Sequence, residues 1–211
     1  MAERTQAAQA YNELSRRILI LEILPGERII EEVWGEKLDV NRSAIREALT
    51  RLLGEGLVRQ GERGGFFVSE MTDAEVRELR EVREALETAA FELACDRATP
   101  QQIKELAETC DDFGTFVRKG YQTAAHEADL RFHHLLMAAS GNARLAQLYE
   151  RSRIPLFHRK VMRGGGAHPE DFELTEREHR AILDALRKRD KKGGVEQLKA
   201  HFNRGARDAL E

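Results

Sequence analysis

The sequence predicts a mainly α-helical protein with two domains, a small N-terminal domain over residues 1–72 and an antiparallel all-helical bundle over residues 73–211. Beyond Thr72 the apolar residues recur at helical spacing over long segments. The first seventy residues contain shorter elements, because turn residues interrupt them repeatedly at Pro25-Gly26, Asp39-Val40-Asn41, Gly54-Glu55-Gly56 and Arg63-Gly64-Gly65.

Composition restricts the class of protein before any motif is considered. The 211 residues include 41% apolar and 34% charged side chains, a profile that excludes fibrous, disordered and disulfide-framework proteins. No apolar run approaches the roughly 20 residues that a membrane span requires. We therefore expect a cytoplasmic protein with no membrane partner. The net charge of −3 gives no electrostatic indication of nucleic acid.

The N-terminal segment predicts three helices and a hairpin. The first helix, about residues 6–24, carries apolar residues at three- and four-residue spacing and is stopped by Pro25. Two shorter helices and two strand-like runs follow at about residues 29–38, 41–53, 57–60 and 66–69. Two short helices joined by a tight turn and followed by a hairpin have the element order of a winged helix-turn-helix.

The C-terminal segment predicts six helices. They are expected at about residues 73–97, 101–119, 122–140, 143–162, 172–189 and 193–210. Thr72 can cap the first of them, and Glu75 three residues later completes a capping box. Pro100 stands at the N-terminus of the second.

The third predicted helix carries the residue types that a DNA-reading helix needs. Its exposed first turns contain Asn41, Arg42, Ser43 and Arg46. Arginine can pair two acceptors on guanine, while asparagine, serine and helix N-terminal amides reach bases or phosphates. Gly64 and Gly65 would let the tip of the wing approach the minor groove closely. The alternative is a winged helix used for protein contacts, with its arginines solvated.

The motifs of this region are specific to one family. The run Leu24-Pro25-Gly26-Glu27-Arg28, the segment R-S-A-I-R-E-A-L and the run from Arg63 to Val68 closely resemble the N-terminal domain of GntR-family transcriptional regulators. The resemblance implies binding of double-stranded operator DNA through Asn41, Arg42, Ser43 and Arg46, with the wing at Gly64 and Gly65. It departs at Glu32, where the fatty-acid regulator of the family uses an arginine. One recognition helix reads only a few bases, so a homodimer on two half-sites is expected.

The C-terminal segment contains all seven histidines, and some of them are candidate metal ligands. Asp129 and His133 lie four residues apart on one helix face, and an antiparallel last pair of helices brings His179 and His201 within about a turn of each other. One oxygen and three nitrogen donors suit a divalent metal ion such as Zn or Ni. Satisfied core histidines or a surface Asp–His pair are the alternatives, and His126 shares the face of Asp129.

Four further motifs point to an effector-binding domain. E-A-D-L-R-F-H, A-S-G-N, E-H-R-A-I-L-D-A-L and A-H-F look like the FCD domain of the FadR subfamily. The resemblance to its metal-dependent members implies the ligands Asp129, His133, His179 and His201. Arg83 lies on an apolar helix face and needs an anion, either Glu87 or a ligand carboxylate. The resemblance favours Arg83 as a binding residue for a small carboxylate effector near the metal.

These features predict a ligand-responsive DNA-binding transcription regulator and not an enzyme. Two other functions fit the same residues. One is a metalloenzyme fused to a DNA-binding module, because a metal with an open position can also catalyse hydrolysis. The other is a metal-responsive repressor for which the ion itself is the signal.

Overall fold

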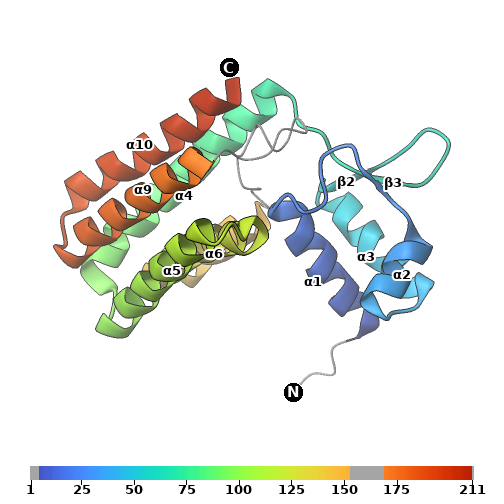
Figure 1. Ribbon diagram of the computed structural model, residues 1–211, viewed down its shortest axis with the longest axis horizontal. Coiled ribbons are helices and arrows are strands. Elements are labelled where there is room, and N and C mark those ends of the chain that lie inside the picture. Colours follow the sequence, from blue (N-terminus) through green and yellow to red (C-terminus); the bar gives the residue numbers. More distant parts are fainter. Residues whose placement is uncertain (1–4, 153–168, 211) are drawn as a thin grey trace. The chain divides into compact units, whose positions relative to one another are not determined.

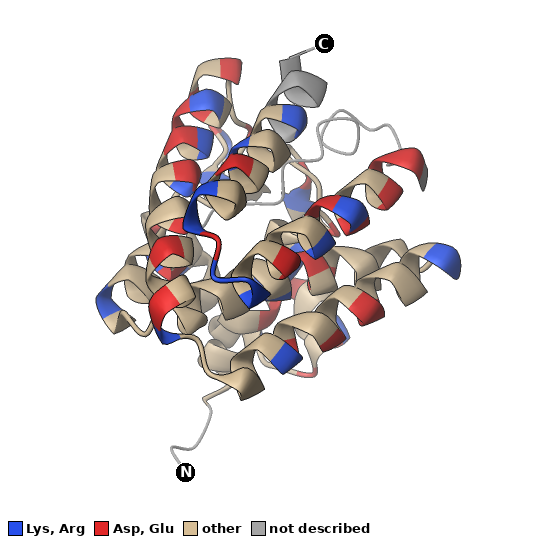
Figure 2. Ribbon diagram, turned by 90° about the vertical axis from the view of Figure 1, so that its left-hand side faces the viewer, with Lys and Arg blue, Asp and Glu red and all other residues tan. Residues whose placement is uncertain are grey.

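The computed structural model describes residues 5–152 and 169–210, and the chain divides into two compact units, Met1–Met71 and Thr72–Glu211 (Figure 1). The predicted fold class is confirmed, because both units are built mainly from helices. Figure 2 shows acidic and basic residues interspersed along the helices that face the viewer.

The N-terminal unit is a winged helix-turn-helix. Its helices are α1 (Gln6–Leu19), α2 (Glu31–Leu38) and α3 (Arg42–Gly54), and its strands are β1 (Arg28–Ile29), β2 (Val58–Gln60) and β3 (Phe66–Val68). The strands form an antiparallel sheet in the order β1-β3-β2. Leu14 of α1 is fully buried together with Ile45 and Leu49 of α3, so the recognition helix is fixed on the rest of the unit by its apolar face.

Two boundaries in this unit differ from the prediction. The first helix ends at Leu19 and not near Leu24, because Leu21 adopts a left-handed backbone with φ of 59° and the apolar residues after it turn into the core. The second helix begins at Glu31, because Arg28 and Ile29 pair with Phe67 and Phe66 as a third strand. A strand of two residues is too short for alternation to reveal it.

The turn between α2 and α3 sets the start of the recognition helix. Asp39 adopts a left-handed backbone with φ of 51°, and Asn41 caps α3 by accepting a 2.8 Å hydrogen bond from the Ala44 amide. The Asn41 side chain also donates to Gln6 Oε1. A β-carbon on Gly35 would lie 3.0 Å from the Val40 carbonyl oxygen, so the close approach of this turn to α2 favours glycine there.

The C-terminal unit is an all-helical bundle. Its described helices are α4 (Asp73–Arg97), α5 (Pro100–Arg118), α6 (Gln122–Ala139), α7 (Ala143–Arg151), α9 (Pro169–Arg187) and α10 (Lys191–Leu210). The capping box of Thr72 and Glu75 is present, and Pro100 is the first residue of α5. The helix predicted over 143–162 is observed to Arg151, and residues 153–168 lie outside the described part of the chain.

The bundle core brings α4, α6, α9 and α10 together. Its largest cluster includes fully buried side chains from each of these helices, namely Phe91, Phe132, Leu136, Ile182 and Leu198. None of the helices in the described part of the chain combines the length and apolar character needed to cross a membrane. The four candidate metal ligands and the glutamates that contact them lie on the same four helices.

Candidate functional site

The first turns of α3 present the predicted DNA-reading residues. Asn41, Arg42, Ser43 and Arg46 are all exposed, while Ala44 and Ile45 between them are buried. The four side chains therefore lie on the solvent side of a helix that is anchored from behind. The Asn41 side-chain oxygen is already used as the cap of α3, so the two arginines are the long exposed side chains of this surface.

The wing is a tight glycine turn. Gly64 and Gly65 have φ of 82° and 85°, backbone conformations that favour glycine. The Gly64 amide donates to the Gly61 carbonyl oxygen, and the Gly61 amide donates to that of Gly65. The Arg28 guanidinium lies beside Gly65, at 3.5 Å from where a β-carbon would stand. Arg28 was not predicted to lie at the wing, because the strand that places it there was not predicted.

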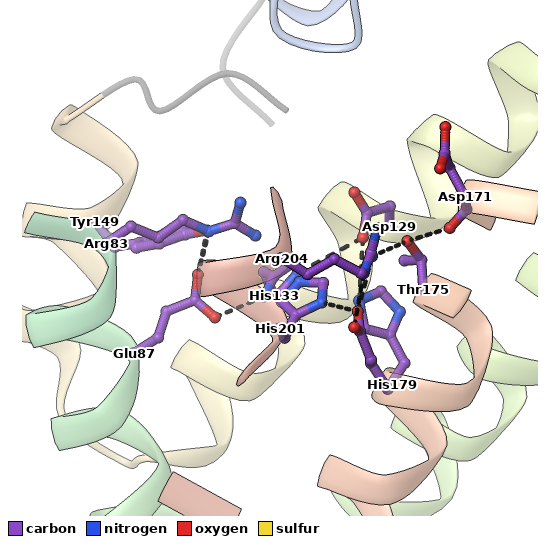
Figure 3. Close-up of polar contacts among 11 residues, drawn as sticks. Arg83, Glu87, Asp129, His133, Tyr149, Asp171, Thr175, His179, His201 and Arg204 are labelled. Carbon is purple, nitrogen blue, oxygen red and sulfur yellow. Dashed lines mark hydrogen bonds and ion pairs between the residues drawn. The ribbon is translucent and has the colours of Figure 1, made fainter. Parts of the chain in front are cut away.

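The four candidate metal ligands come together in the bundle (Figure 3). Asp129 and His133 come from α6, His179 from α9 and His201 from α10, and all four side chains are buried. One donor atom from each lies within 4.8 Å of the others, and in the described ranges only this set forms such a group. The alternative donor His126 is not part of it, and its ring lies against Phe172 instead, with centroids 5.2 Å apart.

Two histidines of the cluster are oriented by carboxylates that the sequence did not reveal. His133 Nδ1 lies 2.6 Å from Glu87 Oε2, and His201 Nδ1 lies 2.7 Å from Glu178 Oε2. Each carboxylate contacts Nδ1 of its imidazole ring, so Nε2 is the ring nitrogen that remains to bind a metal. Metal-binding histidines almost always use their other ring nitrogen in this way.

Several buried polar atoms of the cluster have no hydrogen-bond partner among the residues that the structure describes. They include Asp129 Oδ1, His133 Nε2 and His179 Nε2. Asp129 Oδ1 lies 3.1 Å from His179 Nε2 and 3.6 Å from His133 Nε2. Unsatisfied buried polar groups are rare because each one costs free energy. Two ligand atoms that each lie about 2.1 Å from one ion are at most about 4.2 Å apart. The four donor atoms lie within 4.8 Å of one another, so only small side-chain shifts would bring them to ligand distances. The donor set fits a divalent cation.

The electrostatics favour the deprotonated form for three of the four donors. Burial and Arg83 alone would lower the pKa of His133, but Glu87 and Asp129 outweigh them and raise it. Burial lowers the pKa of His179 to about 4 and also lowers the pKa of His201. Burial alone would raise the pKa of Asp129, but the facing histidines outweigh it and hold that pKa well below its usual range. These three side chains therefore offer lone pairs at neutral pH, as cation binding requires.

Arg83 is paired with Glu87, the internal partner considered above. Its Nε donates a 2.7 Å hydrogen bond to Glu87 Oε1, and the Tyr149 hydroxyl donates to the same oxygen at 2.9 Å. The guanidinium lies 5.0 Å from the centre of the Phe202 ring. Its two terminal nitrogens make no hydrogen bond to any side chain or backbone group in the described ranges. Tyr149 comes from α7, and nothing in its sequence context indicated this contact.

A second arginine completes the polar surroundings. Arg204 donates to both oxygens of Glu178 and to Thr175 Oγ1, at 2.7 to 2.8 Å. Burial alone would raise the pKa of Glu178, but His201 and Arg204 outweigh it and lower that pKa to about 2. Each carboxylate behind the cluster thus bridges one histidine and one arginine.

Glu87→Ala is expected to destabilise the protein by about 3–5 kcal/mol, because it leaves the Arg83 guanidinium buried without a counter-charge. Glu84→Ala on the same helix removes the partly exposed ion pair with Arg80 and should cost less than about 1 kcal/mol. Urea unfolding followed by circular dichroism measures both. Equal losses for the two variants would contradict the description of Glu87 as the anchor of the network.

Comparison with known proteins identifies two domains. Residues 6–68 match the model for bacterial regulatory proteins of the gntR family, and residues 78–204 match the FCD domain. The chain is 31% identical over 196 residues to the uncharacterized HTH-type transcriptional regulator YdhC of Bacillus subtilis, covering 92% of this chain and 87% of YdhC. It is 26% identical over 197 residues to the HTH-type transcriptional regulator McbR of Escherichia coli, covering 88% and 84%.

Solved structures agree with this similarity. The structure of Escherichia coli McbR/YncC superposes with a TM-score of 0.81 at 24% identity, over 95% of this chain and 94% of that one, which shows a common fold. The metal-free FCD domain of TM0439 matches with a TM-score of 0.54 at 26% identity, over 67% of this chain and 96% of that domain.

Proposed function

The chain belongs to the gntR family of bacterial regulatory proteins, and from that premise we propose that it binds operator DNA as a homodimer and responds to a small carboxylate held at a metal site. Its helix-turn-helix is the DNA-binding part of a transcription regulator, and its FCD domain is the ligand-binding part. The observation that carries the proposal is the buried set of one carboxylate and three imidazoles with unsatisfied donor atoms.

Operator binding is supported by the exposed arginines of α3. Arg42 and Arg46 project from a helix whose other face is buried, so they can enter a major groove while the domain stays intact. The wing of the same unit offers a narrow backbone turn at Gly64 and Gly65, with the Arg28 guanidinium next to it. Because one helix reads only a few base pairs, a homodimer on two half-sites supplies the remaining specificity.

A divalent ion would be held by Asp129, His133, His179 and His201. Zn or Ni fits three imidazole nitrogens and one carboxylate oxygen better than the oxygen-preferring ions Mg and Ca. A bound ion would supply an open Lewis-acid position for a ligand oxygen. The carboxylates of Glu87 and Glu178 orient two of the imidazoles in advance, which reduces the rearrangement that binding requires.

Charge around the cluster favours an anionic effector. Arg83 and Arg204 cancel Glu87 and Glu178, and cation binding requires neutral histidines, so Asp129 then sets the net charge of the groups around the cluster. A divalent cation changes the sum from one negative to one positive charge, which attracts a carboxylate. The free terminal nitrogens of Arg83 can pair the second oxygen of that carboxylate.

Replacing both recognition arginines tests operator binding. Arg42→Ala/Arg46→Ala is expected to weaken binding of an operator that the wild-type protein has selected from a random duplex library by at least tenfold, since each base contact contributes about 1–3 kcal/mol. Fluorescence anisotropy measures the affinities, and Arg77→Ala on α4 is the control for loss of one exposed positive charge. Undiminished operator affinity in the folded double variant would remove α3 from the interface.

Metal binding is tested by stability and by metal content. Zn or Ni should raise the thermal midpoint of chelator-treated protein, because a ligand that binds only the native state stabilises it by mass action. His179→Ala should abolish this shift and lower the metal content measured by elemental analysis. His134→Ala, which replaces the exposed neighbour of His133, should preserve both. A wild-type protein that takes up no metal would contradict the site.

Arg83→Lys tests the effector proposal without leaving Glu87 unpaired. A lysine keeps the charge but loses the paired terminal nitrogens, so affinity for small carboxylates should fall about tenfold or more while metal content stays unchanged. Calorimetry with a panel of mono- and dicarboxylates measures this, with Arg80→Lys as the matched control on α4. Metal that shifts operator affinity without any acid would instead favour a sensor of the ion itself.

A further inference from the structure

Glu31 joins the two exposed arginines of the recognition helix. It is the first residue of α2, and its Oε2 accepts a 2.7 Å hydrogen bond from Arg42 Nε. Its Oε1 lies 3.4 Å from Arg46 Nε. The Glu31 side chain is 13% exposed, whereas those of Arg42 and Arg46 are 72% and 71% exposed. One carboxylate fixed against the protein therefore restrains two side chains that otherwise extend into solvent.

The atoms used in these contacts leave the reading ends of the arginines free. The hydrogen bond of Arg42 and the closest approach of Arg46 to Glu31 both go through Nε. A guanidinium has five donors in a rigid fork, so pairing at Nε keeps the two terminal nitrogens available. Those nitrogens match the O6 and N7 acceptors of guanine in the major groove. Restraint at Nε thus orients the guanidinium without using the groups that would contact a base.

A carboxylate on this surface also opposes indiscriminate DNA binding. Residues 1–71 contain 10 basic and 12 acidic residues, so the DNA-binding unit has no excess of positive charge. Non-specific affinity comes almost entirely from attraction between cationic side chains and phosphates. Glu31 offsets part of the charge of Arg42 and Arg46 at the point where phosphates approach. Contacts of both aligned arginines with bases can compensate for the attraction that the Glu31 charge removes. Contacts with phosphates alone compensate for it less well.

We propose that Glu31 is a positioning residue for operator specificity, which holds the Arg42 and Arg46 guanidinium groups in the orientation that discriminates base pairs and lowers affinity for other DNA. The inference rests on the operator binding by α3 proposed above. It predicts that removal of the Glu31 charge lowers the ratio of operator affinity to unrelated-duplex affinity more than it lowers the affinity for DNA as such. A residue that only stabilised α2 would change affinity for all duplexes alike.

The test compares affinities for three duplexes at one fixed salt concentration. The full-length wild-type protein first selects an operator from a random duplex library, and Kd is then measured for that operator, for a copy with one G·C pair replaced, and for an unrelated duplex. Glu31→Gln is expected to reduce the ratio of operator to unrelated affinity about tenfold, with the affinity for the unrelated duplex unchanged or higher. Glu31→Asp keeps the charge on a shorter side chain and should give an intermediate ratio.

Glu36→Gln is the matched control. It removes the same charge elsewhere on α2, and the Glu36 side chain is exposed and makes no hydrogen bond or ion pair with the described residues. This variant should bind all three duplexes slightly more tightly with the ratio unchanged. Identical ratios for wild type, Glu31→Gln and Glu31→Asp would overturn the role of Glu31 while operator binding stands. A wild-type protein that enriches no sequence would overturn operator binding itself, and the inference with it.

Discussion

Pairing of buried charges is the constraint on which the C-terminal bundle depends. An ionised side chain that is removed from water needs a counter-charge and hydrogen bonds, because its desolvation costs several kcal/mol. Glu87 is fully buried and satisfies three donors at once, from Arg83, His133 and Tyr149. Burial by itself would raise its pKa, but the charges of His133 and Arg83 hold the pKa below its usual range. The same network therefore ties α4 to α6 and α7 and fixes the orientation of one metal-ligand candidate.

Local sequence signals were sufficient for most of the fold and failed where long-range contacts decide. The capping box at Thr72, the proline at the start of α5 and the glycine turn of the wing each have a short-range cause, and each is present. Strand β1 has no such cause, because Arg28 and Ile29 are extended only through pairing with β3. The early end of α1 likewise follows from burial of the residues after Leu19, which the spacing of apolar residues does not distinguish from a longer helix.

In the candidate site, too, the features with a short-range cause were predicted and those that depend on long-range contacts were not. Asp129 and His133 could be paired from the sequence because four residues make one turn of a helix. His179 and His201 required an assumption about how α9 and α10 fold together, supported by resemblance to a family. Glu87 was considered only as a partner of Arg83, and neither carboxylate was predicted to contact a histidine, since Glu87 lies 46 residues before His133, and Glu178 lies 23 residues before His201. Glutamates are common on helices, and only the three-dimensional structure shows that these two face the imidazoles.

Helix α4 connects the proposed effector site to the DNA-binding unit through the chain itself. It begins directly after that unit, with its first turn fixed by the Thr72 capping box. Arg83 lies ten residues from the start of α4, about 15 Å at 1.5 Å per residue. A carboxylate that bound both the metal and the terminal nitrogens of Arg83 would add a second contact to the guanidinium that Glu87 already holds at Nε, and so alter the restraint on α4. Such a ligand changes operator affinity only if it binds the DNA-competent and incompetent arrangements differently. Linkage then requires operator DNA to change the affinity for the acid by the same factor.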